Sequence, residues 1–154
     1  MAWTFAGMRD AVAAHIGSAD VVLFAAAVAD FRPEEARLAK VKRSGEGSSL
    51  DLHMVANPDV AVDTRSVRKP GAFVVGFALE TEDLVENARL KLESKGFDLV
   101  VSNPAGVAGA GFESDTNQVT IVGPDGATEV LPPMGKDAVA DAVLDRVGEL
   151  LSAR

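Results

Sequence analysis

The residues best suited to chemistry follow directly on an apolar run. Residues 21–29 are apolar throughout, and Asp30 then opens a segment rich in basic side chains that includes Lys40. The apolar run predicts a parallel strand buried on both faces, and open α/β sheets bind their ligands at the carboxyl ends of such strands. An acid followed by cations at this position predicts a site for a small anion, for which a nucleotide is the first candidate.

The charge of the basic segment is opposite to that of the whole chain. The 154 residues carry a net charge of -8. Nucleic-acid binding needs an extended positive face, so the acidic total argues against nucleic acid as a partner and for the capture of one small anion. The segment 32–43 contains the bases Arg32, Arg37, Lys40, Lys42 and Arg43 against the acids Glu34 and Glu35.

Composition excludes several kinds of catalytic centre. The chain has no cysteine, and His15 and His53 are its two histidines. Disulfides, thiolate nucleophiles and histidine-rich metal centres are therefore excluded, which agrees with a reducing compartment. No apolar run reaches the roughly 20 residues of a membrane span, and the first residues do not resemble a secretion signal. We expect a cytoplasmic protein with no membrane partner.

Two further stretches offer groups for an anion. Asn57-Pro58-Asp59 predicts a helix start with Asn57 as N-cap and Pro58 at the first helical position, and the amides of a helix start bind anions. A plain helix start explains the same residues, so both interpretations stay open. Lys91 and Lys95 are four residues apart and share a helix face, although lysines near a helix end are more often simply solvated.

The elements that must position these groups alternate along the chain. The alternation predicts one domain, residues 1–154, with a three-layer, Rossmann-like α/β fold, a mostly parallel sheet and an antiparallel edge. Between the first two strands, a charged and glycine-rich stretch predicts an exposed arm. We expect helices at about 6–16, from 57, at 82–95 after a Thr81 cap and at 138–151, and strands at 20–27, 50–55, 72–79, 97–102 and 118–122.

Six motifs in one order resemble a single family. The chain is similar over essentially its whole length to phosphopantothenoylcysteine synthetase, the ligase half of the bifunctional bacterial coenzyme A biosynthesis flavoprotein. One such motif is weak evidence, whereas six in register are strong. The motifs occupy residues 25–33, 40–42, 57–59, 74–81, 95–98 and 111–117.

The resemblance implies a reaction and a set of residues. The family ligates 4'-phosphopantothenate and cysteine through an acyl-cytidylate, with CTP and Mg²⁺ in the bacterial form. Lys40 is the expected catalytic residue, and Asp30 is the candidate contact for the nucleotide or its metal. The implied nucleotide-binding residues are Phe24, Ala25, Ala26, Asp30, Lys40, Pro58, Asp59, Val60, Ala61, Phe77, Lys91 and Lys95.

The resemblance also implies partners. The arm, about residues 31–55, matches the family's dimerisation region, where one subunit helps to complete its neighbour's site, so we expect a homodimer. A decarboxylase domain or chain is a further expected partner, and FMN belongs to that half rather than to this chain. Family members begin with a glycine-rich strand and a Ser-Ser-Gly loop before the region matching residues 4–12. This chain lacks both, so we expect its own active site to be incomplete.

Two other functions remain as alternatives. The first is a non-catalytic nucleotide-binding or assembly module of the same fold, which would bind CTP without releasing pyrophosphate. The second is an unrelated α/β enzyme such as a dehydrogenase, which the lack of a Gly-x-Gly-x-x-Gly motif after a strand disfavours. The residues leave the choice between CTP and ATP open.

Overall fold

A five-stranded sheet forms the centre of the computed structural model, which describes residues 4–35, 39–42, 49–105 and 115–154. The strand order is β1-β4-β5-β7-β8, with β1, β4 and β5 parallel and β7 and β8 antiparallel to their neighbours. The predicted α/β class and antiparallel edge are confirmed. The strands are β1 (Val21–Phe24), β4 (Phe73–Glu80), β5 (Leu99–Pro104), β7 (Thr120–Val122) and β8 (Thr128–Val130).

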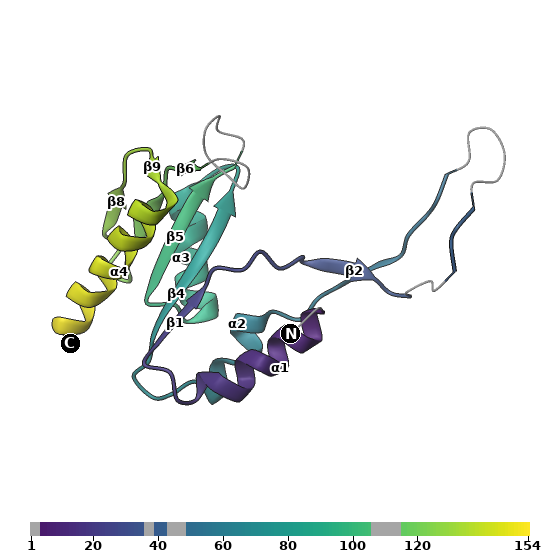
Figure 1. Ribbon diagram of the computed structural model, residues 1–154, viewed down its shortest axis with the longest axis horizontal. Coiled ribbons are helices and arrows are strands. Elements are labelled where there is room, and N and C mark those ends of the chain that lie inside the picture. The colour runs from purple at the N-terminus through teal and green to yellow at the C-terminus, as the bar shows by residue number, and fades with distance from the viewer. Residues whose placement is uncertain (1–3, 36–38, 43–48, 106–114) are drawn as a thin grey trace.

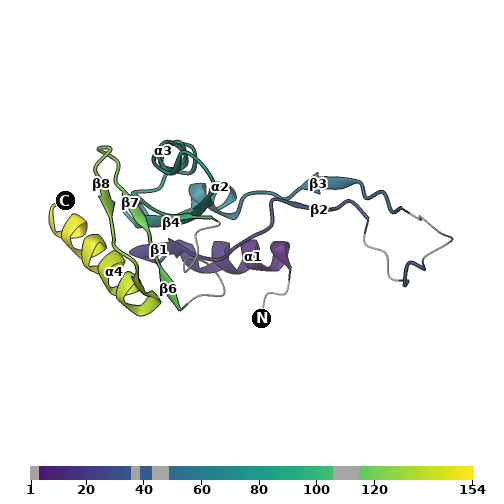
Figure 2. The same ribbon diagram turned by 90° about the horizontal axis from the view of Figure 1, so that it is seen from above.

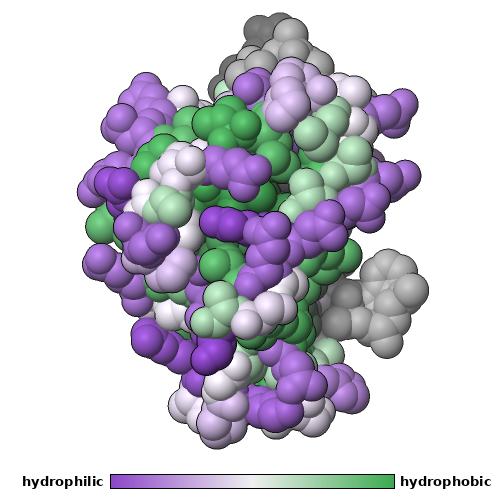
Figure 3. All heavy atoms as spheres, turned by 90° about the vertical axis from the view of Figure 1, so that its left-hand side faces the viewer, coloured by the Kyte–Doolittle hydropathy of each residue, from purple (hydrophilic) through white to green (hydrophobic). Residues whose placement is uncertain are grey.

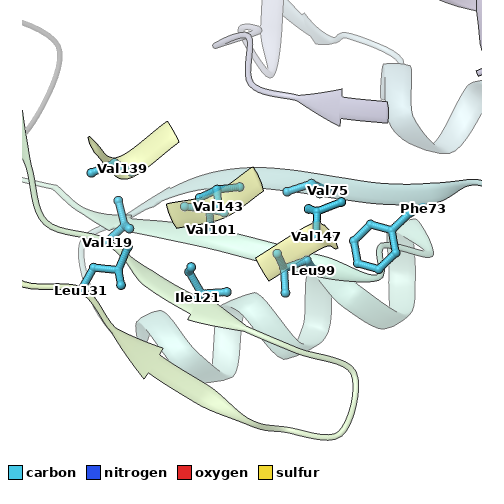
Figure 4. Packing of buried hydrophobic residues seen from close by; sticks show 10 residues of the cluster. All are labelled: Phe73, Val75, Leu99, Val101, Val119, Ile121, Leu131, Val139, Val143 and Val147. Carbon is cyan, nitrogen blue, oxygen red and sulfur yellow. The ribbon is translucent and has the colours of Figure 1, made fainter. Parts of the chain in front are cut away.

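Helices cover both faces of this sheet and make it a three-layer structure (Figures 1 and 2). The helices α2 (Val60–Asp63) and α3 (Leu84–Lys95) lie on one face, and α4 (Lys136–Ser152) lies on the other. Because both faces are covered, β4 is a nearly unbroken apolar run and β5 begins with one over residues 99–101. The cluster under α4 is shown in Figure 4 and includes Phe73, Val75, Leu99, Val101, Ile121, Val139, Val143 and Val147.

The helix ends follow local side-chain chemistry. The first helix, α1 (Phe5–Ile16), begins after Thr4, whose hydroxyl accepts a hydrogen bond from the Gly7 amide at 3.1 Å. The predicted end of α3 is confirmed, because Gly96 takes the left-handed conformation with φ 61°. Its predicted Thr81 cap is wrong: the helix begins after Asp83, which itself has a left-handed backbone, with φ 50°.

The strand β1 differs from its prediction. The expected strand over 20–27, buried on both faces, is only four residues long, and Leu23 is 41% exposed. Among the described strands β1 has β4 as its one neighbour, so it forms an edge of the sheet. Ala25 and the five residues after it are exposed and continue outward instead of extending the strand.

The predicted arm is exposed and projects from the sheet as a narrow ribbon (Figures 1 and 2). Its antiparallel strands β2 (Phe31–Pro33) and β3 (Met54–Ala56) pair over three residues. The strand expected over 50–55 therefore begins only at Met54, because β2 is three residues long and pairs with no residue before Met54. Residues 36–38 and 43–48, including Arg37 and Arg43, lie outside the described part of the arm.

Two small features complete the fold. A short 3₁₀ helix spans Arg65–Val67, and β6 (Thr116–Asn117) pairs with β9 (Met134–Gly135). On the side formed by α4 and β8, charged and apolar side chains are intermixed at the surface (Figure 3). Within the described ranges, each helix is too short or too polar to cross a bilayer.

Candidate functional site

The start of α2 faces the end of α3 through a charged contact. The Lys95 Nζ atom lies 2.7 Å from the Asp59 Oδ2 atom. The other carboxylate oxygen of Asp59 accepts hydrogen bonds from the amides of Ala61 at 2.9 Å and Val62 at 3.2 Å. Asp59 is therefore the N-cap of α2, and the prediction of Asn57 as cap with Pro58 at the first helical position is wrong by two residues.

Asn57 ties the arm to the body instead of capping the helix. Its amide donates to the Asp30 carbonyl at 2.7 Å, and its Nδ2 donates to the Ala29 carbonyl at 2.7 Å. Arg32 Nη1 donates to the Asn57 Oδ1 atom at 3.0 Å. These bonds hold Asp30 beside Pro58, so two stretches predicted to bind the anion meet at the base of the arm.

The environment of Asp59 favours its charged form. Burial opposes ionisation, but the hydrogen bond from Lys95 and those from the Val62 and Ala61 amides outweigh it and lower the pKa of the Asp59 carboxyl below its ordinary value. A carboxylate thus stays at the helix start over the neutral pH range. It accepts the hydrogen bonds of the Ala61 and Val62 amides at this helix start.

A second acid–lysine pair lies nearer the start of α3. Lys91 Nζ is ion-paired with the Glu80 Oε1 atom, and Asn87 Nδ2 donates to the Glu80 Oε2 atom at 3.0 Å. Glu80 is the last residue of β4. Lys91 and Lys95 therefore lie one helical turn apart, and each is held by a carboxylate from a different element.

Arg68, which was not predicted as a site residue, connects α2 with the end of α3. Its guanidinium donates to the Gly96 carbonyl at 2.8 Å and to the Ala61 carbonyl at 2.5 Å, and it lies 5.7 Å from the centre of the Phe24 ring. Burial, followed by repulsion from Arg65, lowers the pKa of Arg68 from its ordinary value. Arg68 gave no local signal, because a basic residue before a buried strand is ordinary in a solvated turn.

The chain as a whole is similar to known proteins. Residues 2–151 match the DNA/pantothenate metabolism flavoprotein C-terminal domain. The chain belongs to this family. Among the relatives of the family is the coenzyme A biosynthesis bifunctional protein CoaBC of Vibrio cholerae, 37% identical over 92% of this chain. The same bifunctional protein of Bacillus subtilis is 38% identical over 94% of it. The resemblance to the ligase half of the bifunctional protein is confirmed.

The family members are longer than this chain. The chain spans 35% of the Vibrio cholerae protein and 35% of the Bacillus subtilis protein. A crystal structure of the C-terminal domain of CoaBC matches with a TM-score of 0.72 at 26% identity, over 96% of this chain and 62% of that one. The structure of the DNA/pantothenate metabolism flavoprotein from Streptococcus pneumoniae has the same fold, with a TM-score of 0.73 at 17% identity, over 94% of this chain and 69% of that one.

The structure brings some of the residues implied by the family together and separates others. Asp59 and Lys95 meet on the α3 face of the sheet, where Val60 and Ala61 are buried, and Lys91 lies one helical turn from Lys95 in its pair with Glu80. Phe24 packs on this same face. The remaining residues lie elsewhere: Phe77 packs in the cluster on the α4 face, Ala25 and Ala26 are exposed after β1, and Lys40 lies in the segment 39–42 at the outer part of the arm (Figure 1).

The donor set for a metal ion is sparse. Among the residues that the structure describes, no three acids or histidines lie close enough together to hold an ion. Asp30, the candidate ligand, is exposed beside Asn57. A metal centre built by the protein alone does not fit this arrangement, whereas an ion carried mainly by the phosphates of a nucleotide needs at most one or two carboxylates. The motif part 111–114 lies outside the described residues.

Proposed function

We propose that this chain supplies the nucleotide-binding part of the active site of a CTP-dependent phosphopantothenoylcysteine synthetase, which ligates 4'-phosphopantothenate to cysteine in coenzyme A biosynthesis. The observation that supports the proposal is a pair of lysines one turn apart on α3, in a chain of this family: Lys91 is held by Glu80 at the carboxyl end of β4, and Lys95 is held by Asp59 at the start of α2. The relatives named above are coenzyme A biosynthesis proteins, which supports the pathway.

The proposed reaction has two steps. A carboxylate oxygen of 4'-phosphopantothenate attacks the α-phosphorus of CTP, which forms the acyl-cytidylate and releases pyrophosphate. The amine of cysteine then attacks the acyl carbon, forms the amide bond and releases CMP, while the amine loses a proton. Negative charge moves onto phosphate oxygens in the first step, so positioned cations are the groups that the protein must supply.

The lysines supply these cations. Lys91 and Lys95 are each paired with a carboxylate. Part of each side chain still faces solvent, since the two are 32% and 29% exposed. Each ammonium has three donors, so it can contact a phosphate while it keeps its acid partner. Lys40 is the proposed catalytic residue, because it is the cation that an arm can bring to a site after the substrate binds. Mg²⁺ would enter with the nucleotide and neutralise its phosphate charge.

We propose further that Lys40 acts in a neighbouring subunit. The segment 39–42 lies far out on the arm and away from its own α3 (Figures 1 and 2). The arm is a two-stranded ribbon with exposed apolar residues, and such ribbons are at best marginally stable alone. Pairing with a second copy would bury them and complete a shared site. A decarboxylase domain, with its FMN, is the proposed further partner.

A non-catalytic nucleotide-binding module is the second candidate function. The observation that favours it is that Asp59 itself occupies the Ala61 and Val62 amides, where a phosphate would sit in a catalytic site. Such a module would bind CTP through the lysines without promoting its cleavage.

One assay separates these functions. The chain is incubated with CTP, Mg²⁺, 4'-phosphopantothenate and cysteine, and pyrophosphate and CMP are measured separately. Release of both supports the complete synthetase, and release of pyrophosphate alone supports the first step. CTP that protects against thermal unfolding without release of either product supports the binding module. Lack of both turnover and protection would overturn both functions. Replacing CTP by ATP in parallel tests the choice of nucleotide.

A further inference from the structure

The Glu80 carboxylate is almost enclosed at the end of a central strand. Its side chain is 12% exposed, and it follows a run of apolar residues in β4. An ionised carboxylate in such a place is costly unless both oxygens have partners. Here both do, since Lys91 pairs with one and Asn87 donates to the other at 3.0 Å. Glu80 therefore belongs to a built arrangement and not to a solvated surface.

The turn between β4 and α3 is shaped to make this arrangement. Asp83 has φ 50°, the one left-handed backbone outside glycine in the described part of the chain. This conformation turns the chain sharply into α3 and places Asn87 and Lys91, four residues apart, on the helix face toward Glu80. Asn87 locks the turn as well, because its Nδ2 also donates to the Glu82 carbonyl at 3.0 Å.

We propose that Glu80 is a positioning residue, which holds the Lys91 ammonium at the place where it contacts the phosphates of the nucleotide. The inference rests on the proposed function. A lysine has a flexible stem and loses much rotamer freedom when it binds a ligand. Glu80 fixes Lys91 before the ligand arrives and so removes this cost, as Asp59 does for Lys95 one turn further along.

A purely electrostatic role and a positioning role of Glu80 predict different CTP binding by two variants of this residue. If Glu80 acts only as a nearby negative charge, Glu80→Gln removes repulsion and tightens CTP binding, while Glu80→Asp leaves binding unchanged. If Glu80 positions Lys91, both variants weaken binding, because glutamine lacks the charge and aspartate is one methylene too short to hold the ammonium. We expect both to bind CTP about fivefold more weakly than the natural chain.

The experiment is calorimetric titration of the whole chain with CTP and Mg²⁺. Glu86→Gln is the matched control, since it removes an exposed acid from the same helix, and it should bind as the natural chain does. Lys91→Ala should weaken binding about tenfold, and adding Glu80→Gln to Lys91→Ala should cause no further loss. Thermal unfolding in the absence of CTP verifies that each variant is folded.

The outcomes separate the inference from the function on which it rests. Unchanged or tighter binding by Glu80→Gln, in a chain whose Lys91→Ala variant binds weakly, overturns the positioning role alone. A full additional loss in the double variant overturns it too, because Glu80 would then act independently of Lys91. A natural chain that fails to bind CTP, or a Lys91→Ala variant that binds normally, overturns the nucleotide site and the positioning role with it.

Discussion

The strands β4 and β3 show two ways in which this chain forms a strand. β4 pairs with a strand on each side, and helices cover both its faces, so most of its eight residues are buried. β3 has one partner over three residues, and its side chains are exposed or half-buried. The body thus carries the stability of the fold, whereas the arm adds little to it. Substitutions in the arm should alter function without altering folding, whereas substitutions in the buried core of the body should first of all lower stability.

The largest expected effect comes from the arm. Lys40→Ala should lower the rate of pyrophosphate release by about a hundredfold, the usual loss when one group that stabilises a developing oxyanion is removed. The melting temperature should not change, because Lys40 is exposed on the arm. Lys42→Ala, in the same described segment, is the control for general loss of charge. An equal loss of rate in both variants would mean that the arm acts through its charge and not through Lys40.

Mixing variants tests where Lys40 acts. If it serves the neighbouring subunit, a mixture of Lys40→Ala and Lys95→Ala chains should release pyrophosphate faster than either variant alone, because a mixed dimer holds one intact site. Light scattering on the same samples gives the oligomeric state. A dimer that regains no activity would place Lys40 in its own subunit's site and remove the proposed role of the arm.

The largest effect on stability should come from β4. An added Cβ atom at Gly76 would lie 2.2 Å from the nearest atom of the Phe97 ring. Gly76→Ala should therefore lower the free energy of unfolding by about 2 kcal/mol through overpacking. Gly148→Ala, on the exposed side of α4 with open space around it, should instead stabilise the chain slightly, by about 0.5 kcal/mol. Denaturant unfolding measures both changes in the free energy of unfolding. Changes of the same sign in the two variants would contradict this packing.

A smaller loss is expected at Arg68, which connects α2 with the end of α3. Arg68→Met keeps the length of the side chain but leaves the Gly96 and Ala61 carbonyls without their donors. We expect about 1.5 kcal/mol of destabilisation by denaturant unfolding, the ordinary cost of an orphaned buried acceptor. Arg154→Met is the comparison on the α4 face of the sheet, where the guanidinium lies over the Phe73 ring and is paired with Asp98. A negligible change at Arg68 would mean that water replaces its guanidinium.

The contrast between body and arm also explains what could be predicted from the sequence. Apolar periodicity identified β4, β5 and α4 because burial is what selects those side chains, and Val139, Val143 and Val147 of α4 are buried. The same reasoning failed at β1, since an apolar run does not reveal whether a strand has one neighbour or two. The cap of α2 was misplaced because both Asn57 and Asp59 suit an N-cap, and only tertiary contacts with Ala29 and Arg32 decide which one is used.

The site shows the same division. The prediction of Asp59, Lys91 and Lys95 as one group rested on family motifs, and no local pattern reveals that a carboxylate from β4 and another from α2 would hold the two lysines. Glu80 did carry a usable signal, because it follows an apolar run in the sequence just as Asp30 follows the apolar run 21–29. Whether Lys40 and Asp30 act in the site stays a prediction.

The smallest expected effect is a dependence on pH at the base of the arm. The pKa of Asp59 is lower in the folded chain than in the unfolded one, so the unfolded chain takes up the proton first as the pH falls. The stability that ionised Asp59 contributes is therefore fully present above a pH of about 4 and is lost as the pH falls through its folded pKa.

Asp59→Asn keeps a capping side chain but not the charge. Because the pair with Lys95 is partly exposed and screened, the variant should lose about 0.5 to 1 kcal/mol at pH 7. This difference should shrink as the pH falls below about 4, as measured by thermal unfolding across the range. A difference that stays constant with pH would show that Asp59 acts only as a cap, and that Lys95 is held at the site by something other than this charge.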